Sequence, residues 1–223
     1  MPDQINQSTD SIADSTPFDW KVENKFTTDN IQLVFPAKTF FDTLSFTYSA
    51  SDQIENSYSL VHKIHNKYTP IYKSYSASIK TINIPNELTE KTVIVQKNGD
   101  GKTISSGGEF INGYVVANLK EFGDYFVMID TVAPQIISIL KDRSIIHPDS
   151  TIRFTIKDDL SGIKTYNGYI DNNWALFEYD LKNDLLYYII DEQRINKNTD
   201  HELELLVIDQ KGNINTYYTT LYW

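Results

Sequence analysis

Four histidines, His62, His65, His147 and His201, are the residues best suited to bind a metal ion. His62 and His65 are three residues apart, a spacing that places two imidazoles on one face of a helix but on opposite faces of a strand. The surrounding sequence favours strand or loop, and no third ligand stands nearby. We therefore expect ordinary polar surface histidines and no zinc site.

The sequence lacks the residues that nucleophilic catalysis and phosphoryl transfer require. The chain has no cysteine, no Gly-x-Ser-x-Gly motif, and no serine in a recognisable relation to a histidine and a carboxylate. Gly99-Asp100-Gly101-Lys102 is too short for a phosphate-binding loop and joins two expected strands. We expect no catalytic residues and no cofactor.

Oxygen ligands offer a possible calcium site. Asp158-Asp159 follows one expected strand, and Asp209 with Asn213 follows another, so these side chains could meet at one rim of a sandwich. The calcium candidates are Asp159, Asp209 and Asn213. The alternative, which we favour, is that these residues cap turns through local backbone hydrogen bonds.

Exposed aromatic rings could stack on sugars. The candidates lie in the last sixty residues: Tyr166, Tyr169, Trp174, Tyr179, Tyr217 and Trp223. In a small sandwich most such rings fill the core, so we expect few of them to face solvent.

Composition favours an all-β protein. The 223 residues are 40% hydrophobic and include fifteen Tyr and eleven Phe, which suit pleated, half-buried surfaces. The formal net charge of -10 repels phosphate backbones and anionic lipid surfaces, so nucleic acid is not an expected partner. The absence of cysteine excludes disulfides and a lipid-anchor cysteine but leaves the compartment open.

The chain divides into a tail and two domains. Residues 1–22 are polar and are expected to form a disordered tail or linker, without the features of a signal peptide. No segment is long and apolar enough for a transmembrane span. Residues 23–130 and 131–223 are expected to form two immunoglobulin-like β-sandwiches in tandem, separated where Pro134 imposes an extended backbone.

Alternating apolar residues mark the strands. Six are expected before Asp130, at 31–35, 44–48, 75–79, 93–95, 114–116 and 126–128. Later strands are expected at 152–156, 168–170, 174–179, 185–190, 203–207 and 214–223, with 185–190 fully buried. Asn98 to Gly101 and Asp171 to Asn173 favour hairpin turns. The Leu119 to Tyr125 segment resembles the corner of immunoglobulin-like sandwiches, where a tyrosine hydroxyl bonds to upstream backbone.

Several motifs in order resemble one family. Phe35-Pro36, Phe41-Asp42-Thr43-Leu44, Tyr68-Thr69-Pro70, Phe122-Gly123-x-Tyr125 and Asp130-Thr131-x-Ala133-Pro134 are followed by Asp158-Asp159-x-Ser161-Gly162-Ile163, Ile170-Asp171-x-x-Trp174, Glu178-Tyr179-Asp180 and Asp209-x-x-Gly212-Asn213. This order is similar to the region after the catalytic domain in lysostaphin-like (LytM-type) zinc endopeptidases of Gram-negative envelopes.

The resemblance implies an accessory, non-catalytic part of a peptidoglycan peptidase, located in the cell envelope, with peptidoglycan or an envelope protein as partner. The family holds zinc with His-x-x-x-Asp and His-x-His motifs, and neither occurs here. If the protein works outside the cytoplasm, its export signal would lie upstream. The alternative is an independent adhesion or carbohydrate-binding module.

Overall fold

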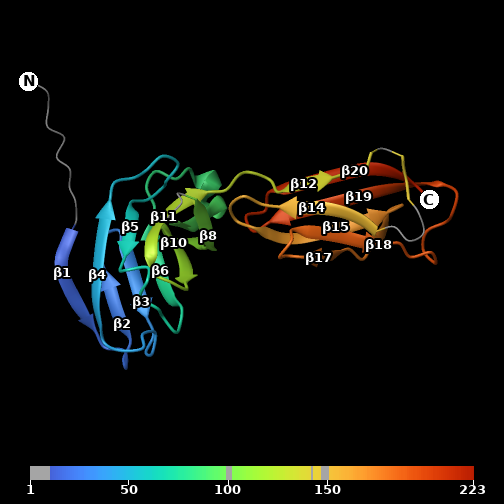
Figure 1. Ribbon diagram of the computed structural model, residues 1–223. Helices are drawn as coiled ribbons and strands as arrows, with labels where there is room; N and C mark the ends of the chain where they lie inside the picture. The colour runs from blue at the N-terminus through green and yellow to red at the C-terminus, as the bar shows by residue number, and fades with distance from the viewer. Residues whose placement is uncertain (1–10, 99–101, 142, 147–150) are drawn as a thin grey trace, which may run out of the picture. The chain divides into compact units, whose positions relative to one another are not determined.

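The computed structural model describes residues 11–98, 102–141, 143–146 and 151–223 of a nearly all-β chain (Figure 1). The chain divides into two compact units, residues 1–130 and 131–223. Each unit is a sandwich of two sheets with its own buried core. The expected all-β sandwich class is confirmed.

The first unit packs a six-stranded sheet against a five-stranded sheet. The six-stranded sheet has the order β1 (Ser11–Phe18), β4 (Leu44–Ser51), β5 (Val61–Ile64), β11 (Gly123–Ile129), β7 (Thr92–Lys97) and β8 (Thr103–Gly107). The five-stranded sheet has the order β2 (Asn24–Thr27), β3 (Ile31–Phe35), β6 (Tyr75–Lys80), β10 (Tyr114–Leu119) and β9 (Glu109–Ile111). All neighbouring strands in both sheets are antiparallel.

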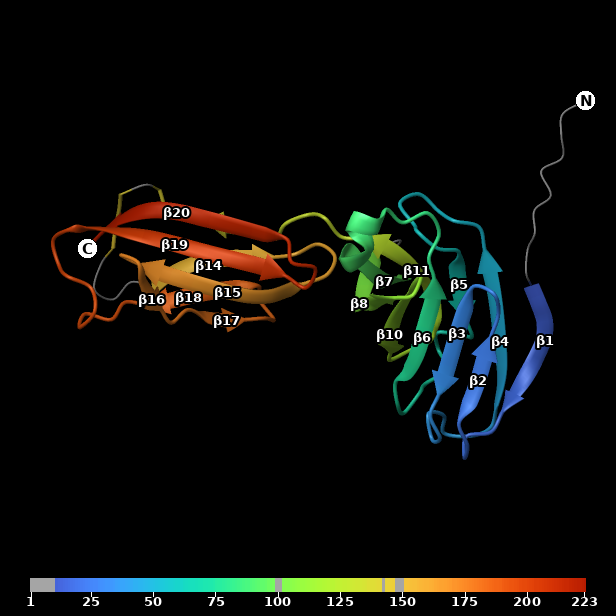
Figure 2. The ribbon, with the colours of Figure 1, turned by 180° about the vertical axis from the view of Figure 1, so that it is seen from behind.

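The second unit has a four-stranded and a five-stranded sheet, both visible from behind in Figure 2. The four-stranded sheet has the order β12 (Gln135–Ser138), β14 (Thr151–Lys157), β18 (Leu185–Ile189) and β17 (Glu178–Asp180). The five-stranded sheet has the order β13 (Ser144–Ile145), β20 (Ile214–Tyr222), β19 (Asp200–Asp209), β15 (Ile163–Ile170) and β16 (Asn173–Ala175).

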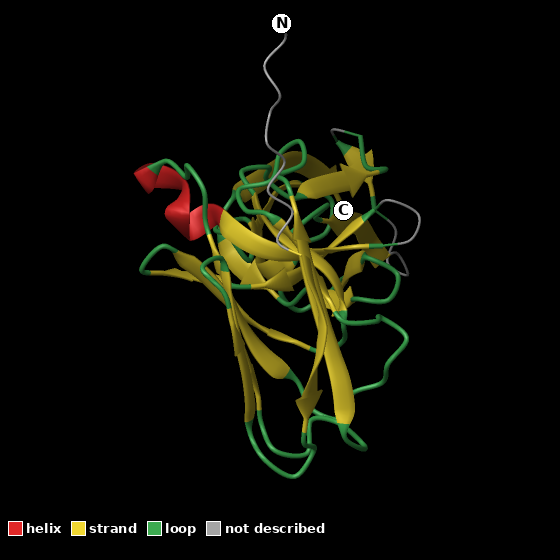
Figure 3. Ribbon diagram, turned by 90° about the vertical axis from the view of Figure 1, so that its left-hand side faces the viewer, coloured by secondary structure: helices red, strands yellow, loops and turns green. Residues whose placement is uncertain are grey.

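Among the described residues, one short 3-10 helix, η1 (Asn86–Lys91), interrupts the strands. It is the red element of Figure 3 and leads directly into β7. Pro85 precedes it with φ of -61°, an angle that proline fixes and that suits the start of a helical turn.

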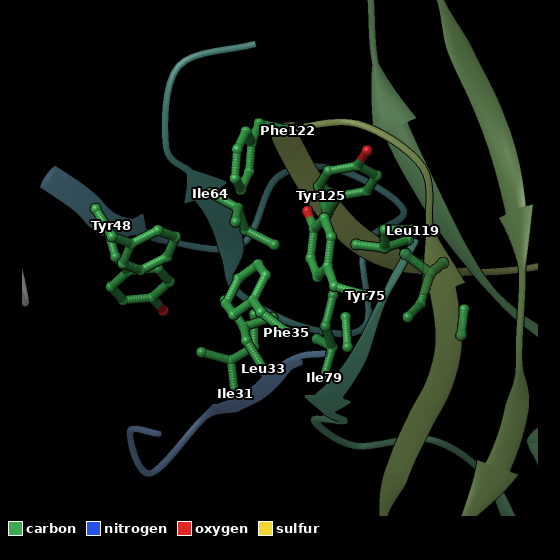
Figure 4. Packing of buried hydrophobic residues seen from close by; sticks show 14 of the residues in the cluster. Ile31, Leu33, Phe35, Tyr48, Ile64, Tyr75, Ile79, Leu119, Phe122 and Tyr125 are labelled. Atoms are coloured by element: carbon green, nitrogen blue, oxygen red, sulfur yellow. The ribbon is translucent and has the colours of Figure 1, made fainter. Parts of the chain in front are cut away.

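The core of the first unit is unusually aromatic (Figure 4). Phe35 stacks on Tyr75 with ring centroids 4.6 Å apart, and Phe18 stacks on Phe46 at 4.6 Å. Each pair joins rings from neighbouring strands of one sheet. Phe35 and Phe46, from different sheets, lie 5.5 Å apart, so the flat side chains fill the space between the sheets. The alternating burial of β3 shows why the period of two in the sequence predicts a half-buried strand.

The corner predicted at Leu119 to Tyr125 is confirmed. The Tyr125 hydroxyl donates a hydrogen bond to the carbonyl oxygen of Glu121 at 2.9 Å. Tyr75, from the facing sheet, donates to the same oxygen at 3.0 Å. Burial raises the pKa of both phenols, which therefore remain protonated donors.

Several sequence-based expectations need correction. The tail prediction is wrong for residues 11–18, which form β1, because the strand pairs its backbone with β4 and buries Phe18 in the core. The six strands expected in the first unit are present, but β2, β5, β8 and β9 were not predicted; they are short, and three of them bury few side chains. The 185–190 strand alternates between buried and partly exposed residues instead of being fully buried.

The segment expected as one strand at 174–179 is two strands in different sheets. β16 pairs with β15, whereas β17 pairs with β18, so the chain crosses between the sheets at Leu176 and Phe177. The Asp171 to Asn173 hairpin turn is confirmed, with positive φ at Asp171 (49°) and Asn172 (61°). The turn expected at Asn98 to Gly101 falls largely on residues 99–101, which lie outside the described residues.

Candidate functional site

A groove of about 680 Å³ lies in the second unit, beside the β15–β16 hairpin. We call it the Trp174 groove; the residues that matter for its chemistry are Trp174, Leu176, Glu178, Ile189, Asp191 and Arg194. Its volume falls in the range of roughly 300–1,000 Å³ that is typical of sites for small molecules.

The apolar part of the groove is exposed to solvent. Trp174, Leu176 and Ile189 expose 52%, 60% and 62% of their surfaces, respectively. Leaving such side chains in water forgoes about 1.5–3 kcal/mol each of burial free energy. A flat ring beside two aliphatic side chains therefore gains free energy when a ligand covers it.

Polar groups line the same groove. Asp191 accepts from Arg194 across an exposed ion pair, with Nε and Oδ2 separated by 3.4 Å. Exposed pairs of this kind contribute little to stability, so both groups can exchange partners with a ligand. Glu178 Oε2 accepts a hydrogen bond of 2.7 Å from the Tyr187 hydroxyl, a bond that raises the pKa of Tyr187 and holds the carboxylate in place.

The hairpin that carries Trp174 is held by the Asp171 carboxylate. Its Oδ1 accepts from the backbone N–H of Glu202 at 2.9 Å, and its Oδ2 lies 2.6 Å from His201 Nδ1. The other ring nitrogen of His201, Nε2, lies 2.8 Å from the backbone oxygen of Asn196. The buried His201 therefore joins the hairpin to the 191–199 segment, and both segments contribute residues to the lining of the groove.

The crossing after β16 depends on a glycine. A Cβ placed on Gly168 would lie 2.1 Å from a ring carbon of Phe177, closer than any non-bonded contact allows. The ring packs against the glycine backbone and is buried to 3% exposure. This anchor fixes the chain where it leaves one sheet for the other, between exposed Leu176 and Glu178.

Of the six aromatic residues expected as sugar-stacking candidates, Trp174 is the one that the structure exposes most. Tyr166 and Tyr179 pack edge to face at 5.6 Å, and Tyr217 packs against Phe154 at 5.3 Å. Tyr169 is partly buried. Trp223 is 7% exposed and belongs to the core, so it cannot serve as a stacking platform.

The calcium candidates are engaged in local hydrogen bonds. Asp209 Oδ1 accepts from the backbone N–H groups of Lys211 (2.7 Å) and Asn213 (2.8 Å), and Oδ2 accepts from the Asn213 amide at 2.7 Å. Asp159 is exposed, and its Oδ1 lies 3.9 Å from Lys157 Nζ and not beside Asp209 and Asn213. These contacts are those of turn-capping side chains.

The neighbouring acid, Asp158, faces Asp209 in place of Asp159. One carboxylate oxygen of each lies within 4.8 Å of the other. Asp158 Oδ2 also accepts from the backbone N–H groups of Leu160 (3.1 Å) and Gly162 (2.8 Å), so it caps the turn that precedes β15. The sequence predicts the correct turns for these acids, but it does not show which of Asp158 and Asp159 points toward Asp209.

The expectation of surface histidines is wrong for His62 and His201, which are 0% and 3% exposed. His62 Nδ1 lies 2.7 Å from the Tyr48 hydroxyl, and Nε2 has no hydrogen-bond partner among the described residues. Burial lowers the pKa of His62 from 6.5 to about 4. His65 is partly buried, and its Nδ1 lies 3.1 Å from the Thr47 hydroxyl. His147 lies outside the described residues.

The fold and groove define a two-domain β-sandwich protein with a ligand-sized groove in its second domain. Comparison with protein families matches residues 15–130 to the Zu5-like domain, and the chain belongs to this family. The match covers the first sandwich, from within β1 to Asp130. A comparison with curated proteins finds no match.

The described part of the chain includes no helix with the length and apolar composition needed to cross a bilayer.

Proposed function

We propose that the chain is a non-catalytic accessory region of a cell-wall zinc metallopeptidase, and that its second domain binds a glycan of the wall in the Trp174 groove. The observation that carries the proposal is the half-exposed indole of Trp174 beside the polar groups of Glu178, Asp191 and Arg194.

The chemistry of the groove suits a sugar. A pyranose presents an apolar face of C–H groups, which an exposed indole ring covers, and a rim of hydroxyl groups. Carboxylates accept hydrogen bonds from hydroxyls, and the guanidinium of Arg194 donates to them. The groove therefore offers both kinds of contact that an oligosaccharide makes.

The link with a peptidase rests on the ordered motifs that resemble the region following a LytM-type catalytic domain. The metal-binding motifs of that family are absent from the sequence: Asn66, Thr69, Thr151 and Leu205 follow the four histidines by four residues, where an aspartate would be needed. The accessory region would then hold the peptidase on its substrate by binding the wall.

The second candidate is an independent adhesion or carbohydrate-binding module, which the same groove favours. The two candidates differ in what precedes the domains. An in-frame catalytic domain with His-x-x-x-Asp and His-x-His motifs in the upstream gene sequence would support the first, and a wall-binding chain without one would support the second.

Binding to purified peptidoglycan and to its soluble glycan fragments tests the proposal. We expect the chain to sediment with peptidoglycan and Trp174→Ala to weaken this binding about tenfold or more, since exposed aromatic anchors carry much of the binding free energy. Tyr218→Ala is the matched control, because Tyr218 is 68% exposed in the same domain and does not line the groove.

Equal binding by Trp174→Ala and the unaltered chain would show that the groove is not the glycan site. A chain that binds neither peptidoglycan nor any member of a glycan array would contradict the binding function itself.

A further inference from the structure

A second depression, of about 570 Å³, lies on the first unit and is rich in lysine. We call it the lysine depression; its charged and strongly polar residues are Lys63, His65, Asn66, Lys67, Lys97 and Asp124. It lies on the Zu5-like domain and shares no residue with the Trp174 groove.

Sheet topology brings the lysines together. β5, β11 and β7 are adjacent in the six-stranded sheet, and Lys63 on β5 lies directly opposite Asp124 on β11. The next pair, Tyr125 with Gln96, places Lys97 beside Asp124 on the other side. Because neighbouring strands are about 4.8 Å apart, the two lysines flank the aspartate in one row on the outer face of the sheet.

The depression carries an excess of positive charge on an acidic protein. Three lysines accompany one aspartate there, whereas the whole chain has a formal net charge of -10. Among the described residues, none of these lysines makes an ion pair, although Lys67 Nζ lies 5.2 Å from the centroid of the Tyr68 ring. Ammonium groups that face one concave surface repel each other, and a bound anion removes this repulsion.

Neighbouring side chains present hydrogen-bond donors to the same space. The backbone N–H of Thr47 donates to His65 Nδ1 at 3.3 Å, so the neutral ring carries its proton on Nε2. Burial lowers the pKa of His65, which favours this neutral donor form. Asn66 uses its side-chain oxygen to accept from the Tyr68 N–H at 3.0 Å, and its amide group is left as a donor.

We propose that the lysine depression binds a phosphate group carried by a small molecule or a lipid headgroup. Lysine binds phosphate as a point charge, whereas planar carboxylates are better matched by the two parallel N–H groups of arginine, and no arginine lines the depression. Its volume exceeds that of a phosphate ion, so it has room for part of the molecule that bears the phosphate.

The experiment is a titration of the full ¹⁵N-labelled chain with pyrophosphate and with inorganic phosphate, followed by amide chemical shifts. Glutarate, a dicarboxylate, is the control anion. A parallel arm measures sedimentation with vesicles of phosphatidylglycerol or of phosphatidylcholine. We expect saturable shifts near residues 63–68, 97–98 and 123–124 for the phosphate ligands, and weaker binding of glutarate.

The test variant is Lys63→Gln/Lys67→Gln/Lys97→Gln. The matched control, Lys38→Gln/Lys80→Gln/Lys120→Gln, changes the net charge equally at exposed lysines of the same unit outside the depression. We expect the test variant to weaken phosphate binding about tenfold and the control to change it less than about twofold, since only local charges act strongly at moderate salt. Equal melting temperatures would show that both variants are folded.

Saturable binding of the soluble phosphates supports a small-molecule source, and binding of phosphatidylglycerol vesicles alone supports a lipid headgroup. Absence of both would overturn the proposal. Equal weakening by the two triple variants would overturn it as well, because the anion would then not be held in the depression. Equally tight binding of glutarate would also overturn it, because the depression would then not select phosphate.

Discussion

The Tyr125 hydroxyl donates a hydrogen bond to the carbonyl oxygen of Glu121, four residues upstream. Tyr75 donates to the same oxygen from the other sheet, so one carbonyl receives a phenol from each layer of the first sandwich. The corner therefore ties the two sheets together and also closes a local turn.

Removal of these two hydroxyls should lower the free energy of unfolding in a way that shows that they share one acceptor. We expect Tyr125→Phe and Tyr75→Phe each to lower the free energy of unfolding by about 1 kcal/mol, the usual net value of a hydrogen bond. The double variant should lose more than the sum of the two, because only then does the Glu121 oxygen lose both donors. Urea denaturation followed by circular dichroism measures this; strict additivity would mean that water replaces either donor.

Gly168→Ala should destabilise the second sandwich by about 1–3 kcal/mol, the typical cost of overpacking, because the new methyl group would overlap the Phe177 ring. Phe177→Leu in the same chain should restore part of the loss by making room. Calorimetry of the full chain measures both. An unchanged transition in Gly168→Ala would show that the ring moves aside at little cost.

Stability should decline as the pH falls from 7 to 5. The pKa of His62 is about 4 in the folded protein and 6.5 in the unfolded chain, so the unfolded state takes up the proton first. The stability that neutral His62 provides is complete above pH 6.5 and is lost as the pH falls toward 4. We expect a loss of about 2 kcal/mol between pH 7 and pH 5 from this residue.

His62→Asn is the control for this pH dependence, because an amide can still bond the Tyr48 hydroxyl but does not titrate. The difference between the two proteins isolates His62 from the carboxylates and from His65. Parallel curves of unfolding free energy against pH would contradict the prediction.

The Asp171–His201 contact should control the shape of the Trp174 groove. We expect Asp171→Ala to lose about 1–3 kcal/mol of stability, because the Glu202 N–H and the His201 ring both lose their acceptor. Glycan binding should weaken in parallel although Asp171 does not line the groove. Asp180→Ala, which alters a turn at β17, is the control; unchanged binding by Asp171→Ala would mean that the groove holds its shape without this contact.

The purified chain should hold no stoichiometric zinc and should not cleave peptidoglycan peptides, because the His-x-x-x-Asp and His-x-His ligand sets are absent from its sequence. Elemental analysis and a peptidase assay with and without chelator check this. One tightly bound zinc per chain, or cleavage that the chelator abolishes, would refute it.

Local patterns in the sequence determined much of the architecture. The alternation of apolar residues in 31–35 and 152–156 predicts β3 and β14, because a strand turns successive side chains to opposite faces. Asp171 and Asn172 predict their hairpin because both tolerate positive φ. The spacing of Tyr125 from Glu121 predicts the corner because its hydrogen bond spans only four residues.

Which of the aromatic side chains in the second unit face solvent follows only from the tertiary structure. Nothing in the sequence distinguishes the exposure of Trp174 from that of Trp223. In the structure Trp223 is buried in the core, whereas the hairpin leaves Trp174 exposed. The β1 strand forms because β4, 26 to 38 positions further along the chain, supplies its backbone partners, and because Phe18 at its end packs into the core. Lys63 and Lys97 lie on either side of Asp124 because β11 lies between their strands, and no local sequence pattern predicts this strand order.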